Sequence, residues 1–152
     1  MVINRGQVEN DVKHLILDVR KVMEPFTAAS LKATKKNSLK DFVSIAGPLH
    51  VSHLLIFTQT DLNDYLKIVR LPRGPSIHFQ LIEYSLCNDV LSTMKKKITH
   101  KKQYLHQPLL IMNGFNSGPI TSQDPQNVEL HHKLLQATLQ NMFPCINVTK
   151  VS

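Results

Sequence analysis

Lysine and arginine side chains gather in three segments of this sequence, and they are the residues with the clearest chemical potential. Eleven of the eighteen cationic residues lie there: Lys32, Lys35, Lys36 and Lys40; Arg70 and Arg73; Lys95, Lys96, Lys97, Lys101 and Lys102. Each segment is predicted to be a loop or a helix end, from which long cationic side chains reach phosphate oxygens. The clusters favour a polyanionic ligand, and the alternative is a solvated face with no ligand.

The composition of the whole chain supports the polyanion hypothesis. Its 152 residues include 18 Lys and Arg against 11 Asp and Glu, a formal net charge of +7. Hydrophobic residues make up 42% and charged residues 19%, which is typical of one globular domain and not of a disordered chain. A basic surplus favours nucleic acid as the first class of partner and an anionic membrane as the second. No apolar run is long enough to span a bilayer, so we expect no membrane segment.

Patterns for metal binding and catalysis are weak. The chain has eight His and two Cys, but His131 and His132 are neighbours on a predicted helix and point about 100° apart. No group has the spacing of a structural zinc site. Four acids offer the alternative of a Mg²⁺ nuclease site: Asp61, Asp64, Glu83 and Asp89. No nucleophile–base pair or phosphate-binding glycine loop accompanies them, so we expect no metal, no cofactor and no enzymatic activity.

The basic segments must be positioned by strands and helices that alternate along the chain. Strands are expected at 2–5, 53–58, 64–71, 77 to about 83, 109–112 and 146–151, and helices at 11–24, 39–46, 88–94 and 128–143. Asn10, and Asn88 or Asp89, are the expected helix N-caps. The three middle strands have short connections and predict an antiparallel meander. The fold class is therefore α/β, a mixed sheet flanked by helices.

Several longer segments resemble a known family. They are LDVRKVMEP (17–25), KKNSLKDF (35–42), AGPL (46–49), RLPRGPSIHFQ (70–80) and NMFPCINVTKV (141–151). In order and spacing they resemble the Brix family, and more narrowly its Peter Pan branch. The resemblance implies a domain of two similar α/β halves, related to the anticodon-binding domain of class IIa aminoacyl-tRNA synthetases. The resemblance therefore implies that residues 1–152 are the N-terminal half of a Brix domain, with a loop insertion at about 114–127.

The resemblance also implies a function. Brix proteins of this branch are nucleolar factors of large-subunit (60S) assembly and rRNA processing, and are not enzymes. They bind pre-rRNA, pair with a smaller protein in a heterodimer and work beside other pre-60S factors. We expect the same here, in the nucleus and nucleolus. The alternative is a protein–protein scaffold within a pre-ribosomal particle that makes no direct RNA contact.

The resemblance ranks the candidate RNA-binding residues. The RLPRGP motif implies Arg70, Arg73 and Gly74 first, although an equal alternative is that Pro72-Arg73-Gly74-Pro75 only fixes a hairpin. The KKNSLKDF motif adds Lys35, Lys36 and Lys40, while its Leu39 and Phe42 are expected in the core. Charge alone supports the last group: Lys95, Lys96, Lys97, Lys101 and Lys102.

Overall fold

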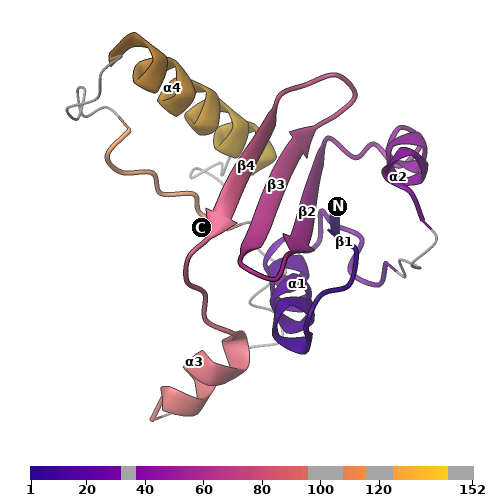
Figure 1. The fold of residues 1–152 in the computed structure, drawn as a ribbon, viewed down its shortest axis with the longest axis vertical. Helices are drawn as coiled ribbons and strands as arrows, with labels where there is room; N and C mark the ends of the chain where they lie inside the picture. The colour runs from indigo at the N-terminus through magenta and orange to yellow at the C-terminus, as the bar shows by residue number, and fades with distance from the viewer. Residues whose placement is uncertain (32–36, 96–107, 116–124, 144–152) are drawn as a thin grey trace, which may run out of the picture. The chain divides into compact units, whose positions relative to one another are not determined.

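The computed structural model describes residues 1–31, 37–95, 108–115 and 125–143, with the backbone alone described for 125–129. It forms two compact units, Met1–His106 and Gln107–Ser152 (Figure 1). The elements of the first unit are β1 (Val2–Arg5), α1 (Asn10–Val22), α2 (Leu39–Ala46), β2 (His53–Gln59), β3 (Asp64–Arg70), β4 (Ser76–Leu81) and α3 (Cys87–Thr93). The second unit contains α4 (Pro125–Met142).

The first unit is built on a four-stranded mixed sheet, as the sequence predicts. The strand order is β1-β2-β3-β4, with β1 parallel to β2 and both later pairs antiparallel. A parallel pair needs a long crossover, and the segment with α1 and α2 supplies it. The short turns after β2 and β3 give the predicted meander. One row of apolar residues crosses all four strands, from Val2 to Leu55, Ile68 and Ile77.

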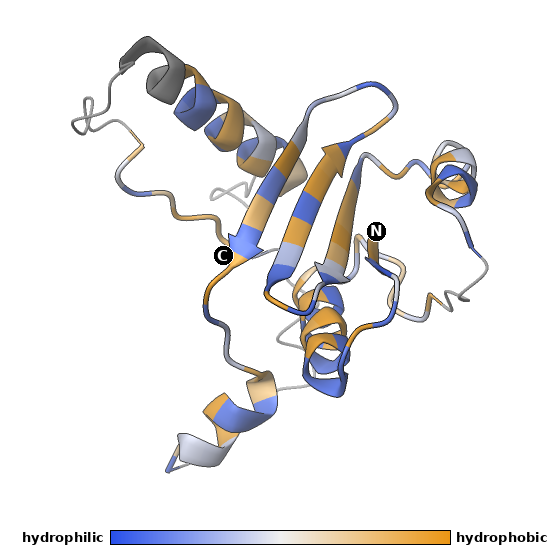
Figure 2. Ribbon diagram, viewed as in Figure 1, coloured by the Kyte–Doolittle hydropathy of each residue, from blue (hydrophilic) through white to orange (hydrophobic). Residues whose placement is uncertain are grey.

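Strand β2 is the centre of the core because it is covered on both faces. Residues 53–57 are all buried, and Figure 2 shows a largely hydrophobic β2 beside β3 and β4, where hydrophobic and hydrophilic residues alternate. A strand buried on both faces is apolar throughout, whereas a half-exposed strand alternates. On one face, Leu54 and Ile56 pack in a cluster with Ile3 of β1 and Phe42 of α2. Phe42 is therefore a core residue as expected, but Leu39 is 37% exposed and the prediction for it was wrong.

The buried side chain of Arg20 ties α1 to the sheet. Its Nε and Nη2 donate to the Val2 carbonyl oxygen at 3.2 and 3.0 Å, and its Nη1 donates to the Leu31 carbonyl oxygen at 3.3 Å. The residue is only 8% exposed. The planar fork of an arginine side chain can hold both carbonyls at once, so Arg20 joins the helix, the first strand and the segment leading to α2.

The helix boundaries correct the two expected N-caps. Glu9, not Asn10, is the N-cap of α1, and the Asn10 side chain accepts a hydrogen bond from Lys13 Nζ at 3.1 Å. Leu86 precedes α3, so Asn88 and Asp89 lie inside that helix. The first amide of α3, on Cys87, donates to Asp18 Oδ2 at 2.9 Å. A carboxylate distant in sequence thus satisfies one of the amides that a local cap would otherwise bind.

The chain beyond α3 departs from the predicted strands. Residues 108–113 form no strand, and Leu109 and Ile111 are 70% and 80% exposed. An apolar run becomes a strand only where a neighbouring strand accepts its backbone hydrogen bonds, and none of the described strands pairs with this one. Helix α4 starts at Pro125, inside the predicted loop 114–127, and the expected strand 146–151 lies outside the described residues. None of the helices within the described ranges is long and apolar enough to cross a membrane.

Candidate nucleic-acid interface

The turn between β3 and β4 holds the first-ranked candidate residues in a fixed backbone. The Arg70 amide donates to the Pro75 carbonyl oxygen at 3.1 Å, and the Gly74 amide donates to the Arg70 carbonyl oxygen at 3.1 Å. The Leu71 amide donates to the Ser52 carbonyl oxygen at 2.8 Å, which ties the turn to the segment before β2. The Leu71–Pro72 peptide bond is cis. The turn is therefore held by hydrogen bonds within itself and by one hydrogen bond to the segment before β2.

Gly74 has a steric reason to be glycine. A Cβ atom added to it would lie 2.6 Å from Arg70 Cβ and 2.8 Å from Arg70 Cγ. A glycine in such a place marks a close approach of two chain segments. This favours the hairpin interpretation for Gly74, and its contact with RNA stays a prediction.

Arg70 and Arg73 are exposed and extend from a turn that carries no acid. Both residues are solvent-accessible, and the turn sequence Leu-Pro-Arg-Gly-Pro-Ser (71–76) contains one cation and no carboxylate. Consecutive turns of a meander lie at opposite ends of the strands, so the β2–β3 turn occupies the other end (Figure 1). That turn contains Asp61 and leads into Asp64. The meander therefore has a cationic end and an acidic end.

The histidine nearest the cationic end adds no charge to it. His53 pairs with Arg70 across the β2–β3 ladder and is 6% exposed. Burial lowers the pKa of His53, and the positive charge of Arg70 lowers it further. Its Nδ1 lies 2.9 Å from the Ser52 hydroxyl, while its buried Nε2 has no hydrogen-bond partner among the described residues. The positive potential at this end therefore comes from groups other than His53, Arg70 and Arg73 among them.

The other predicted RNA-binding residues are not gathered into this turn. Lys40 lies in the first turn of α2 and Lys95 follows α3, and both are exposed. A cation in the first turn of a helix opposes the helix dipole, so helix stability does not explain Lys40. The remaining candidates lie outside the described residues: Lys35, Lys36, Lys96, Lys97, Lys101 and Lys102. Within the described ranges, no three His, Cys, Asp or Glu side chains are arranged to hold a metal ion.

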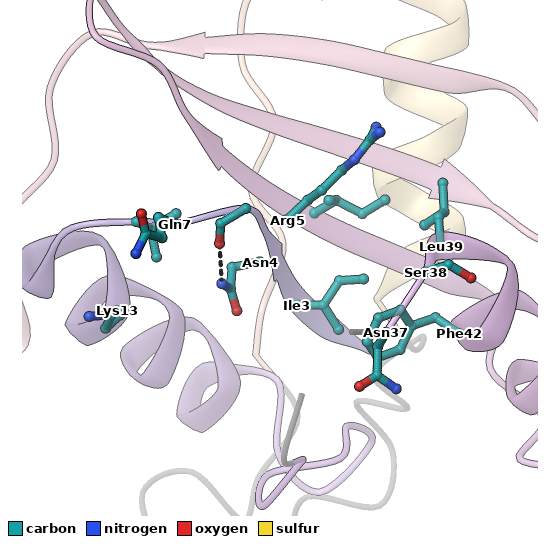
Figure 3. Close-up of a pocket in the computed structure, with 12 residues that line it drawn as sticks. Ile3, Asn4, Arg5, Gln7, Lys13, Asn37, Ser38, Leu39 and Phe42 are labelled. Carbon is teal, nitrogen blue, oxygen red and sulfur yellow. Dashed lines mark hydrogen bonds between the residues drawn. The ribbon is translucent and has the colours of Figure 1, made fainter. Parts of the chain in front are cut away.

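Sequence reasoning missed two cations that line a cavity. A cavity of about 550 Å³ opens beside β1, and Arg5 and Lys13 contribute to its wall (Figure 3). These residues lie on different elements and are separated by acids and amides in the sequence. A search for cationic runs therefore cannot find them. The signal that remains in the sequence is Gly6, which lets the chain turn from β1 back toward α1 with a φ of 80°.

Comparison with known proteins decides the family. The model of the Brix domain matches residues 6–152. The chain belongs to the Brix domain family. The motif-based resemblance to this family is thereby confirmed, and the relatives named below support its Peter Pan branch. The basic turn and the cavity are both features of this Brix domain.

The Brix domain of this chain is similar to several longer proteins. It is 47% identical to the mouse protein named Suppressor of SWI4 1 homolog. The 151 aligned residues cover 99% of this chain and 30% of that protein. It is 42% identical to Drosophila melanogaster Protein Peter pan, over 99% of this chain and 31% of that protein. It is 40% identical to Saccharomyces cerevisiae Ribosome biogenesis protein SSF2, over 100% of this chain and 35% of that protein. The chain thus spans about a third of the length of these relatives.

Proposed function

We propose that this Brix domain is an RNA-binding module of a ribosome biogenesis factor, acting on pre-rRNA during large-subunit assembly and rRNA processing. The name of the yeast relative, Ribosome biogenesis protein SSF2, supports the biological role. The observation that carries the RNA-binding part is the anchored, acid-free turn that exposes Arg70 and Arg73 at one end of the sheet. Binding without catalysis or cofactor is sufficient for this role.

The turn is suited to phosphate contact for two reasons. Arginine donates two parallel hydrogen bonds to a phosphate, so it fixes position as well as charge. The hydrogen bonds of Arg70, Leu71 and Gly74 hold the backbone before any ligand arrives, so less conformational entropy is lost on binding. We propose that Lys40, Lys95 and the lysines outside the described residues supply further phosphate contacts.

A salt series on purified chain and single-stranded large-subunit pre-rRNA fragments tests this function. If about six phosphates are neutralised, the logarithm of the binding constant falls against log salt with a slope of about −4 to −5. Arg73→Ala should weaken binding to all fragments and reduce that slope by about 1. Lys21→Ala is the matched control, since Lys21 is an exposed cation on α1 that already pairs with Asp18 at 3.4 Å. A slope near zero in a chain that still melts cooperatively would refute RNA binding.

The second candidate function is a protein–protein scaffold, and the acidic end of the meander favours it. Leu62 in the β2–β3 turn and Ile82 just after β4 are both 88% exposed. Exposed aliphatic side chains beside Asp61 and Asp64 suit a protein partner better than RNA. The scaffold hypothesis predicts that Leu62→Ser weakens partner binding while RNA binding stays absent in every variant.

We propose further that the RNA-binding function is carried out in the nucleus and nucleolus. The partners would be a smaller protein in a heterodimer, other pre-60S factors and pre-rRNA, with no membrane contact. The chain would be the N-terminal half of the Brix domain, with an insertion at about 114–127. Fluorescent tagging of the full-length protein, and co-purification of 60S precursors with it, test the location and the partners.

A further inference from the structure

The cavity beside β1 is a recess at an outer strand of the sheet. It has a volume of about 550 Å³, within the range of sites that hold small ligands. Its wall follows the chain from Ile3 through Val8, continues with Lys13 of α1, and closes with residues 37–39 and Phe42 at the start of α2. Figure 3 shows the labelled residues of β1 and α1 on one side of the recess and those of 37–42 on the other. Residues distant in sequence are therefore joined around one space.

The floor of the cavity is apolar and rigid. Ile3, Phe42 and Ile56 belong to the core cluster and are 2%, 6% and 3% exposed. Val8, which also lines the cavity, is 7% exposed. Buried side chains packed at core density change position little when a ligand arrives. The floor is thus a preformed apolar surface.

The rim of the cavity is cationic and rich in amides. Arg5 and Lys13 are exposed, and the described residues that line the cavity include no acid. Asn4 and Gln7 place side-chain amides on the same rim, and the Asn4 amide group donates to the Gly6 carbonyl oxygen at 3.2 Å. Ser38 and Leu39 at the start of α2 also border the space, and the Ser38 amide donates to Asp41 Oδ2 at 2.7 Å. An anionic ligand with a flat apolar part matches this combination.

We propose that the cavity holds one unpaired base of bound RNA, with Arg5 and Lys13 on its flanking phosphates. An unstacked base needs an apolar surface for its face and amide groups for its edge, and the floor and rim provide these together. The phosphates on either side need cations, and Arg5 and Lys13 supply them on the rim. This proposal rests on the proposed RNA-binding function and names a second contact, distinct from the β3–β4 turn.

Site-specific crosslinking of the full chain tests the proposal. The probe is a ten-nucleotide oligouridylate with one 4-thiouridine at its centre, irradiated in complex with the protein. We expect crosslinked peptides that contain residues 3–13 or 37–42. Annealing the probe to its complement should abolish those crosslinks, because a paired base cannot enter the cavity. Arg5→Ala and Lys13→Ala should each lower affinity about three- to tenfold, while Lys21→Ala, a cation further along the same helix, should not.

The outcomes separate this proposal from the function on which it rests. RNA binding with crosslinks confined to residues 70–76, and with no effect of Lys13→Ala, would overturn the cavity proposal and leave the proposed function intact. Equal crosslinking of residues 3–13 by paired and unpaired probe would also overturn base insertion. Absence of any salt-dependent RNA binding by the folded chain would overturn both.

Discussion

Gly74 and Arg70 approach so closely that the one constrains the other. A Cβ on Gly74 would lie 2.6 Å from Arg70 Cβ, far inside a normal carbon–carbon contact. The Cβ and Cγ atoms of Arg70 therefore lie against the backbone of Gly74, which restricts the position of the first part of the arginine side chain. Gly74, which the family motif made a candidate for RNA contact, is therefore needed as a glycine for the packing of the turn.

The first prediction concerns that contact. Gly74→Ala should destabilise the fold by about 1–3 kcal/mol, because the turn must shift to admit the methyl group. Urea denaturation monitored by circular dichroism measures the loss. Gly47→Ala is the control, since a Cβ there meets no atom within 4 Å and should change stability by less than about 1 kcal/mol. Equal effects of the two variants would contradict the steric account.

A second prediction follows from the buried guanidinium of Arg20. Arg20→Met keeps most of the side-chain length but leaves the carbonyls of Val2 and Leu31 without their donor. The expected cost is about 2–4 kcal/mol, since each buried acceptor loses its hydrogen bond. The neighbouring Lys21→Met removes an exposed cation and its surface pair with Asp18, and should cost less than about 0.5 kcal/mol. A urea midpoint for Arg20→Met that matches the parent chain would exclude this anchoring role.

The third prediction is a pH dependence of stability. The pKa of His53 is lowered in the folded state, so below about pH 6.5 the unfolded chain binds a proton that the folded chain does not. Stability contributed by neutral His53 is therefore lost as pH falls through that range, by at most about 1.4 kcal/mol per pH unit. Urea titrations at pH 7.5 and 5.5 measure the effect. His53→Phe should flatten this dependence, whereas His78→Phe, an exposed strand position, should leave it unchanged.

A fourth prediction tests the backbone after α2. His50 has a φ of 52°, a conformation that costs most residues about 1 kcal/mol and glycine almost nothing. His50→Gly should therefore raise the unfolding free energy by up to about 1 kcal/mol, and His50→Val should lower it. Thermal melts of the two variants beside the parent chain give the order. Stabilisation by valine would contradict the observed backbone geometry.

The sequence predicted the elements whose patterns are local. The helix 39–46 and the strands at 2–5, 53–58 and 64–71 were placed to within one residue at each end, because apolar period and Gly or Pro breakers mark them. The run 109–112 misled because apolar composition does not reveal whether a partner strand is available. The N-cap of α3 was misplaced for a similar reason. Its first amide donates to Asp18, which is distant in sequence and cannot be identified from a local motif.

The candidate site was predicted only where cations cluster along the chain. Arg70 and Arg73 were found because they share one turn. The cations of the cavity wall were missed because folding alone brings Arg5 and Lys13 to one space. The burial of Arg20 against two carbonyl oxygens depends on the tertiary path of residues 2 and 31. A single sequence does not show which residues distant along the chain come together in the fold.

The separation of charge along the meander has a kinetic consequence. With Arg70 and Arg73 at one end of the meander and Asp61 and Asp64 at the other, charge is separated along its strands. The field of a polyanion acts on this separated charge with a torque that turns the β3–β4 turn toward the polyanion before contact. Productive encounters then become more frequent than a random collision would allow, and the association rate falls as salt screens the field. For the proposed RNA ligand, the aspartates at the β2–β3 turn would thus favour an approach with Arg70 and Arg73 foremost.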